Sequence, residues 1–137
     1  MKKFSRFVFS LLAAVFLLLP VQGCEADDFA LNSYKTLESS AITYNMVMDA
    51  AADMRASGTL DEDKWNTLRD AALVYYDSYQ TAVSALALYM GVLEATDGEA
   101  PSKANIEELV EAVSTGISDL LTCAINLGVT IKEAVDE

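Results

Sequence analysis

The chain has 137 residues, which is enough for one domain with a single core. It carries nine basic residues, 21 acidic residues and no histidine. A surface this acidic repels phosphate backbones, so nucleic-acid binding is not expected, and the lack of histidine removes the commonest general base and metal ligand. Only two prolines occur, and Ala, Leu and Met are frequent, which favours helices over strands.

The first residues have the pattern of an export signal. Three basic residues lie within the first six positions, and residues 7–19 form an apolar region whose one polar residue is Ser10. This region is shorter than the roughly 20 apolar residues needed to span a bilayer. We therefore expect residues 1–23 to be a cleaved signal peptide. A signal peptide cut elsewhere, or a retained membrane helix, is the alternative.

Residues 20–24, Pro-Val-Gln-Gly-Cys, end this segment. They resemble the lipobox of bacterial lipoproteins, although Gln22 is larger than the residue usual there. The resemblance implies cleavage between Gly23 and Cys24, diacylglyceryl modification of the Cys24 thiol and acylation of the new amine. We expect the acylated Cys24 to hold the protein on a lipid bilayer, because a surface rich in carboxylates is repelled by anionic headgroups and acyl chains supply the attachment.

Residues 24–137 are expected to form one helical domain. They carry six basic and 21 acidic residues, a formal net charge of −15. Apolar residues recur at alternating spacings of three and four, which predicts helices over about residues 27–57, 60–96 and 103–135. The predicted apolar seams are Tyr34, Leu37, Ala41, Tyr44, Met48 and Ala51 in the first helix; Trp65, Leu68, Ala72, Tyr75, Tyr79, Ala82, Leu86, Tyr89 and Leu93 in the second; and Ile106, Val110, Val113, Ile117, Leu120, Ala124, Leu127, Ile131 and Ala134 in the third.

The predicted helices are separated by short breaks. Gly58 and Pro101 interrupt the chain, Thr59 with Glu62 matches a capping box, and Ser102 suits the cap of the third helix. Short connections force neighbouring helices to run antiparallel. The predicted fold is all-α, an up-down-up antiparallel three-helix bundle with coiled-coil-like packing. A fused long helix or an intermolecular coiled coil is the alternative.

This arrangement gives an expected register for the second and third helices. Counting back from their connection places Tyr79 opposite Leu120. The only thiol besides Cys24 is Cys123, beside the third seam, where a small core residue is expected. No nucleophile is paired with a base, and the acidic clusters lack the spacing of a calcium loop. We therefore expect no enzyme activity, no metal and no cofactor.

Residues 78–93 carry no charge on any face of the predicted second helix. Val83, Leu88, Met90 and Val92 widen the apolar stripe well beyond a seam, which indicates that this stretch is covered on several sides. We regard these four residues as a candidate interaction surface and expect Leu88 or Met90 to stay partly exposed. Burial within the bundle, self-association, a partner helix and the membrane surface all remain open as its cover.

The runs Tyr34–Ala41, Tyr44–Gly58 and Tyr75–Leu86 resemble small, uncharacterised helical lipoproteins found in bacterial prophage-like regions. This resemblance implies an envelope lipoprotein and carries over no functional residues. The expected function is a non-enzymatic structural or protein-interaction module, with a homo-oligomer or an envelope protein as the partner. The alternative is a pilotin-like lipoprotein that escorts an outer-membrane secretin. In the sorting of enterobacterial lipoproteins, Asp just after the lipidated cysteine favours retention in the inner membrane. Here Glu25 follows Cys24, so we expect the protein on the periplasmic face of the outer membrane.

Overall fold

The structure is a computed structural model that describes residues 26–91 and 100–131. Three helices make up these residues: α2 spans Ala26–Ala56, α3 spans Glu62–Tyr89 and α4 spans Lys103–Asn126. The chain divides into two compact units, residues 1–32 and 33–137. The first unit is described only for the opening turns of α2, and the bundle lies in the second.

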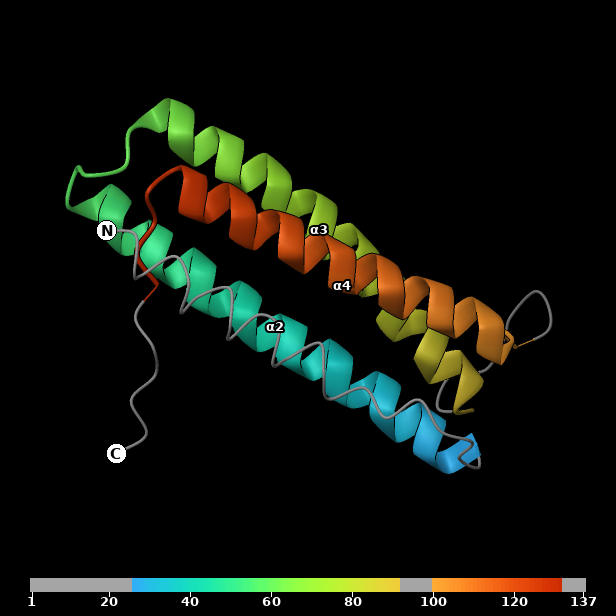
Figure 1. The fold of residues 1–137 in the computed structure, drawn as a ribbon. Helices are drawn as coiled ribbons and strands as arrows, with labels where there is room; N and C mark the ends of the chain where they lie inside the picture. Colours follow the sequence, from blue (N-terminus) through green and yellow to red (C-terminus); the bar gives the residue numbers. More distant parts are fainter. Residues whose placement is uncertain (1–25, 92–99, 132–137) are drawn as a thin grey trace, which may run out of the picture. The chain divides into compact units, whose positions relative to one another are not determined.

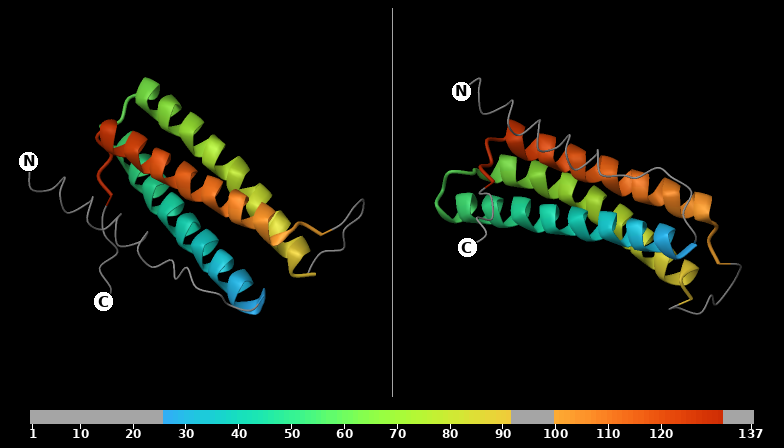
Figure 2. Two further views of the ribbon diagram at one scale, coloured as in Figure 1. Left: turned by 45° about the vertical axis from the view of Figure 1, so that its right-hand side comes forward. Right: turned by 60° about the horizontal axis from the view of Figure 1, so that its bottom comes forward.

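From Ser33 onward the three helices lie side by side, and α3 runs antiparallel to both α2 and α4 (Figures 1 and 2). The predicted up-down-up three-helix bundle is therefore confirmed. One core joins all three helices, because no single amphipathic helix can bury its own apolar stripe. Its buried members are Val47 and Ala51 of α2, Leu60 of the first turn, Leu68 and Ala72 of α3, Leu120 and Ala124 of α4, and Val129.

Glycine ends each of the three helices. Gly58, Gly91 and Gly128 have φ of 74°, 70° and 82°, the left-handed conformation that closes a helix at low cost in glycine. The backbone N–H of Gly128 donates to the carbonyl of Ile125, and that of Val129 donates to Ala124. The predicted helix ends at residues 96 and 135 are wrong, because these glycines stop α3 at Tyr89 and α4 at Asn126.

The start of α3 also differs from the prediction. The N-cap is Asp61, whose carboxylate accepts a 2.9 Å hydrogen bond from the backbone N–H of Lys64. Thr59 was the expected cap, but its backbone N–H donates to Met54, within the closing turn of α2. The predicted capping box with Glu62 is therefore wrong. The predicted cap of α4 is confirmed, since the Ser102 hydroxyl accepts from the backbone N–H of Asn105.

The predicted seams are correct for α3 and α4, whereas in α2 Tyr34 is exposed and the most buried residues differ in part from the predicted ones. Every described seam residue of α3 and α4 is buried or half-buried. In α2 the buried stripe runs through Ser33, Leu37, Ser40, Val47 and Ala51, with Tyr44 half-buried between them. Serine is small enough to let neighbouring helices approach closely, and a search for apolar residues passes over it. At every second position of the stripe, the buried residue is therefore the one just before the predicted residue. Ser33, Ser40 and Val47 are buried in place of the predicted Tyr34, Ala41 and Met48.

The register of α3 against α4 is shifted from the prediction. The backbone of Gly116 lies against Tyr75, where a Cβ built on Gly116 would be 3.5 Å from the Tyr75 Cα. The predicted pairing of Tyr79 with Leu120 would instead have placed Tyr75 about two turns further along α4. Because α3 ends at Tyr89 rather than at residue 96, more chain connects the two helices and the pairing moves.

Two glycine substitutions should change stability in opposite directions. Gly58→Ala is expected to lower the free energy of unfolding by about 1 kcal/mol, because φ of 74° strains any L side chain. Gly116→Ala places a methyl group in ordinary contact with Tyr75 inside α4, so it should be neutral or stabilise by up to about 1 kcal/mol. Urea unfolding followed by circular dichroism measures both. Equal losses would contradict the assigned conformations.

Candidate functional site

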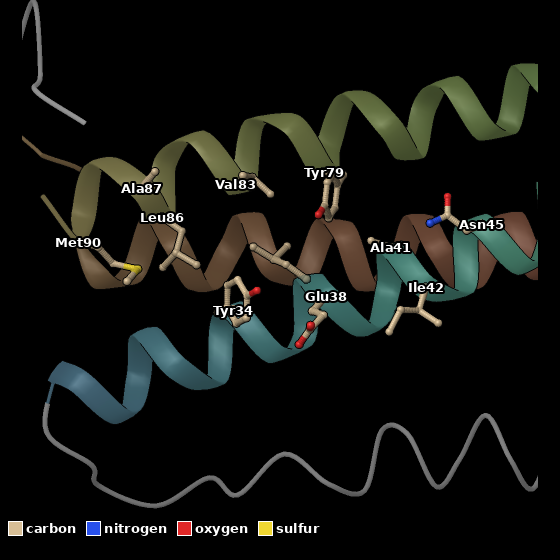
Figure 3. Close-up of a pocket in the computed structure, with 11 residues that line it drawn as sticks. Tyr34, Glu38, Ala41, Ile42, Asn45, Tyr79, Val83, Leu86, Ala87 and Met90 are labelled. Atoms are coloured by element: carbon tan, nitrogen blue, oxygen red, sulfur yellow. The ribbon is translucent and has the colours of Figure 1, made fainter. Parts of the chain in front are cut away.

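A groove of about 440 Å³ lies between α2 and α3 (Figure 3). We call it the α2–α3 groove. The α2 wall consists of Tyr34, Leu37, Glu38, Ala41, Ile42 and Asn45. The α3 wall consists of Tyr79, Val83, Leu86, Ala87 and Met90.

The groove follows the two helices lengthwise. Its walls cover residues 34–45 of α2 and 79–90 of α3, each about 17 Å at 1.5 Å per residue. Leu86 and Met90 point from α3 toward α2, and Tyr34 lies across from them (Figure 3). The groove is therefore about three helical turns long and open to an elongated occupant.

The lining is mostly apolar, and three of its large side chains are well exposed. Tyr34 is 53% exposed, Ile42 56% and Met90 53%, although all three are large apolar or aromatic side chains. Glu38 is the one charged residue among those that line the groove. Exposed apolar side chains around a groove make it a candidate contact site, and tyrosine is common in such sites.

Two of the four predicted interaction residues line the groove. Val83 and Met90 line the α2–α3 groove. Leu88 is half-buried and is not one of the lining residues, so it does not share the surface formed by Met90. Val92 lies outside the described residues, as do the predicted lipidation and cleavage residues Gly23 and Cys24.

The whole α2 wall was missed by sequence reasoning. Tyr34 and Ala41 were assigned to the buried seam, but they line the groove because the buried stripe runs through Ser33 and Ser40. Helix α2 therefore presents two adjacent apolar stripes, one inward and one toward the groove. One residue in the sequence could have indicated this wall. Ile42 is a large apolar residue of α2 that does not belong to the predicted seam.

A buried polar contact joins the two walls beside the groove. The Tyr75 hydroxyl donates a 2.9 Å hydrogen bond to the Ser40 hydroxyl, which donates in turn to the Leu37 carbonyl at 2.8 Å. The Tyr75 ring stacks on Tyr44, with centroids 5.1 Å apart, and on Tyr79 at 5.8 Å. Because Leu37 and Tyr79 both line the groove, this cluster fixes the separation of its walls.

Removing the two partners of this hydrogen bond should have unequal effects. Ser40→Ala leaves the buried Tyr75 hydroxyl without a partner and should lower the free energy of unfolding by about 1–3 kcal/mol. Tyr75→Phe removes the hydroxyl itself and should cost about 0.5–1.5 kcal/mol. In urea unfolding, the double variant should lose less than the sum of the single variants. Strict additivity would show that the hydrogen bond does not hold α2 to α3.

Other candidate sites offer no competing chemistry. Cys123 is half-buried against the core, and burial raises the pKa of its thiol, which disfavours the reactive thiolate. The Arg55 guanidinium lies 5.0 Å from the centre of the Trp65 ring, a cation–π contact at the end of α2. Residues 26–91 and 100–131 contain no metal-binding cluster, and none of their helices is long and apolar enough to cross a membrane.

No family model, curated protein or solved structure matches this chain.

Proposed function

We propose that the protein is a lipid-anchored, non-enzymatic interaction module of a bacterial cell envelope that uses the α2–α3 groove as its docking surface. The observation that carries the proposal is the groove itself. A bundle of three helices could have buried its apolar stripes completely, but here Tyr34, Ile42 and Met90 remain more than half exposed around one groove. That groove is an opening for a further element beside α2 and α3.

The sequence around Cys24 supports the envelope part of the proposal. The basic start, apolar run and Gly23-Cys24 pair form the lipobox pattern, and two or more acyl chains are enough for stable anchoring. With Glu25 after the lipidated cysteine, we place the protein on the periplasmic face of the outer membrane. Membrane fractionation tests this location, and recovery in the inner membrane alone would contradict it.

Cys24→Ala should abolish lipidation, because the thiol is the acceptor of the diacylglyceryl group. We expect loss of label from a fatty-acid analogue fed to growing cells, together with uncleaved precursor or release of the protein from membranes. Cys123→Ala is the matched control and should leave labelling unchanged. Normal labelling of the Cys24 variant would end the lipoprotein proposal.

Site-specific photocrosslinking in cells tests the docking surface. A photoreactive residue at Ile42 or Met90 should crosslink to one helical segment of one protein, at positions spaced by three and four residues. The control position is Val74, which is 67% exposed on α3 and does not line the groove. Equal and scattered crosslinking from all three positions would contradict a docking role.

A pilotin-like role is the second candidate. Such a lipoprotein would grip a helical tail of an outer-membrane secretin, and an open groove three turns long favours it over a closed bundle. The same crosslinks distinguish the two candidates: a secretin tail supports the second, and another envelope protein supports the broader interaction role.

A further inference from the structure

We infer that the α2–α3 groove binds one amphipathic helix of a partner protein, with Lys or Arg residues beside the apolar stripe of that helix. This inference rests on the proposed docking function and specifies the chemistry of the partner. Three features carry it: the length of the groove, the carboxylate of Glu38 on its α2 wall, and the acidity of the whole domain.

The length and lining of the groove select a helix. Its walls extend about 17 Å along the antiparallel helices α2 and α3, so a third helix lying on them would make contacts over about three turns. Apolar residues at positions i, i+3 or i+4 and i+7 of the partner would rest on the exposed side chains of Tyr34, Ile42 and Met90. The result is a four-helix arrangement in which the exposed stripe of α2 gains the cover that the chain's own helices leave open.

The charge of the groove selects a basic helix. Glu38 stands between Tyr34 and Ile42 along the α2 wall, and neither Lys nor Arg is among the lining residues. A partner helix would bring Glu38 into a less hydrated interface, where a carboxylate needs a cationic partner. Residues 24–137 carry a net charge of −15, which steers a cationic segment toward this surface and slows the approach of an anionic one.

The same charges disfavour a second copy as the occupant. Two copies would each contribute a net charge of −15, and packing one groove against another would place both Glu38 carboxylates at the same apolar interface. Like charges in such an interface repel each other. A small apolar ligand also fits poorly, because pockets for such ligands enclose most of the ligand surface, whereas more than half of Tyr34, Ile42 and Met90 is exposed.

The test uses three synthetic 18-residue peptides and the full chain in neutral phosphatidylcholine nanodiscs. The first peptide is an amphipathic helix with one Leu stripe flanked by three Lys, the second has Glu in place of the Lys, and the third is a scrambled form of the first. Fluorescence polarisation measures binding, with empty nanodiscs as the blank. We expect the Lys peptide to bind at least about tenfold more tightly than either of the others.

Matched variants locate the binding. Met90→Glu and Ile42→Glu should each weaken binding of the Lys peptide by about tenfold or more, whereas Val74→Glu, on an exposed face outside the groove, should not. Glu38→Lys should weaken the Lys peptide and strengthen the Glu peptide. Glu107→Lys changes the net charge equally, on the exposed surface of α4, and should leave both nearly unchanged. Circular dichroism verifies that every variant keeps its helices.

The outcomes separate the inference from the proposed function. Equal binding of the Lys and Glu peptides, or equal effects of Glu38→Lys and Glu107→Lys, would overturn the basic partner; the docking function would still stand if Met90→Glu weakened binding. No peptide binding, together with crosslinks from Met90 no stronger than those from Val74, would overturn both. Crosslinks from Met90 into an acidic helix or a second copy of this chain would overturn the inference alone.

Discussion

Leu120→Ala is expected to lower the free energy of unfolding by about 2–5 kcal/mol, as large-to-small changes do in well-packed cores. The Leu120 side chain is fully buried, in a cluster that contains residues from all three helices. Its removal leaves a cavity within this cluster, which no single helix can close by a small shift. For a domain of this size, such a loss is a large fraction of the total stability.

Ile125→Ala is the matched control, because it truncates a side chain of similar size on the same helix. Ile125 is 48% exposed, so its truncation should cost less than about 1 kcal/mol. Thermal or urea unfolding followed by circular dichroism compares the two variants. Similar losses at both positions would contradict the assignment of the inner and outer faces of α4.

Raising the pH from 10 to 12 should destabilise the protein by about 2 kcal/mol through Tyr75 alone. Burial raises the pKa of Tyr75 to about 12, and the hydrogen bond to Ser40 opposes this increase only partly. The unfolded chain ionises near pH 10, whereas the folded protein keeps the phenol neutral. The contribution is therefore complete below pH 10 and is lost as the pH rises through 12.

Tyr75→Phe isolates this contribution from the other groups that titrate in the same range. Urea unfolding at several pH values measures the free energy of unfolding of the wild type and the variant. We expect the wild type to be the more stable of the two at pH 8. Between pH 8 and pH 12, the stability of the wild type relative to the variant should fall by about 2–3 kcal/mol. A difference that does not change with pH would show that the folded protein gives the Tyr75 phenol no protection from ionisation.

The number of helices, their class and their order could be read from the sequence. In α3 and α4 large apolar residues occupy the inward positions, so the alternation of three and four residues and the actual burial coincide at Leu68, Tyr75, Val113 and Leu120. Pattern and packing agree there because a large apolar side chain contributes most when it is buried.

Two kinds of residue, buried serines and the glycines that end helices, could not be assigned correctly from the apolar pattern. Ser33 and Ser40 are buried because they are small and because the Ser40 hydroxyl has partners, a property that hydrophobicity does not report. Gly91 and Gly128 lie within apolar patterns that continue past them, and only the backbone conformation shows that the helices end there. Both errors arise because side-chain polarity is a weak guide to size and to φ.

The docking groove was half predictable for the same reason. Lack of charge in residues 78–93 indicated an extra covered face on α3, and Val83 and Met90 do line the groove. The facing wall depends on which stripe of α2 turns inward, and that choice follows from serine packing against Tyr75 rather than from any local pattern. A concave site between two helices is a property of their pairing, so neither helix alone encodes it.

The up-down-up order also sets how quickly the chain can reach its native state. Each helix packs against the next one along the sequence, and the turn between α2 and α3 needs only residues 57–61. Native contacts therefore close short loops, the entropy lost before the first contact forms is small, and chains with such local contacts fold in microseconds to milliseconds. Exposed stripes of the unfolded chain would then have little time to find wrong partners before they are buried.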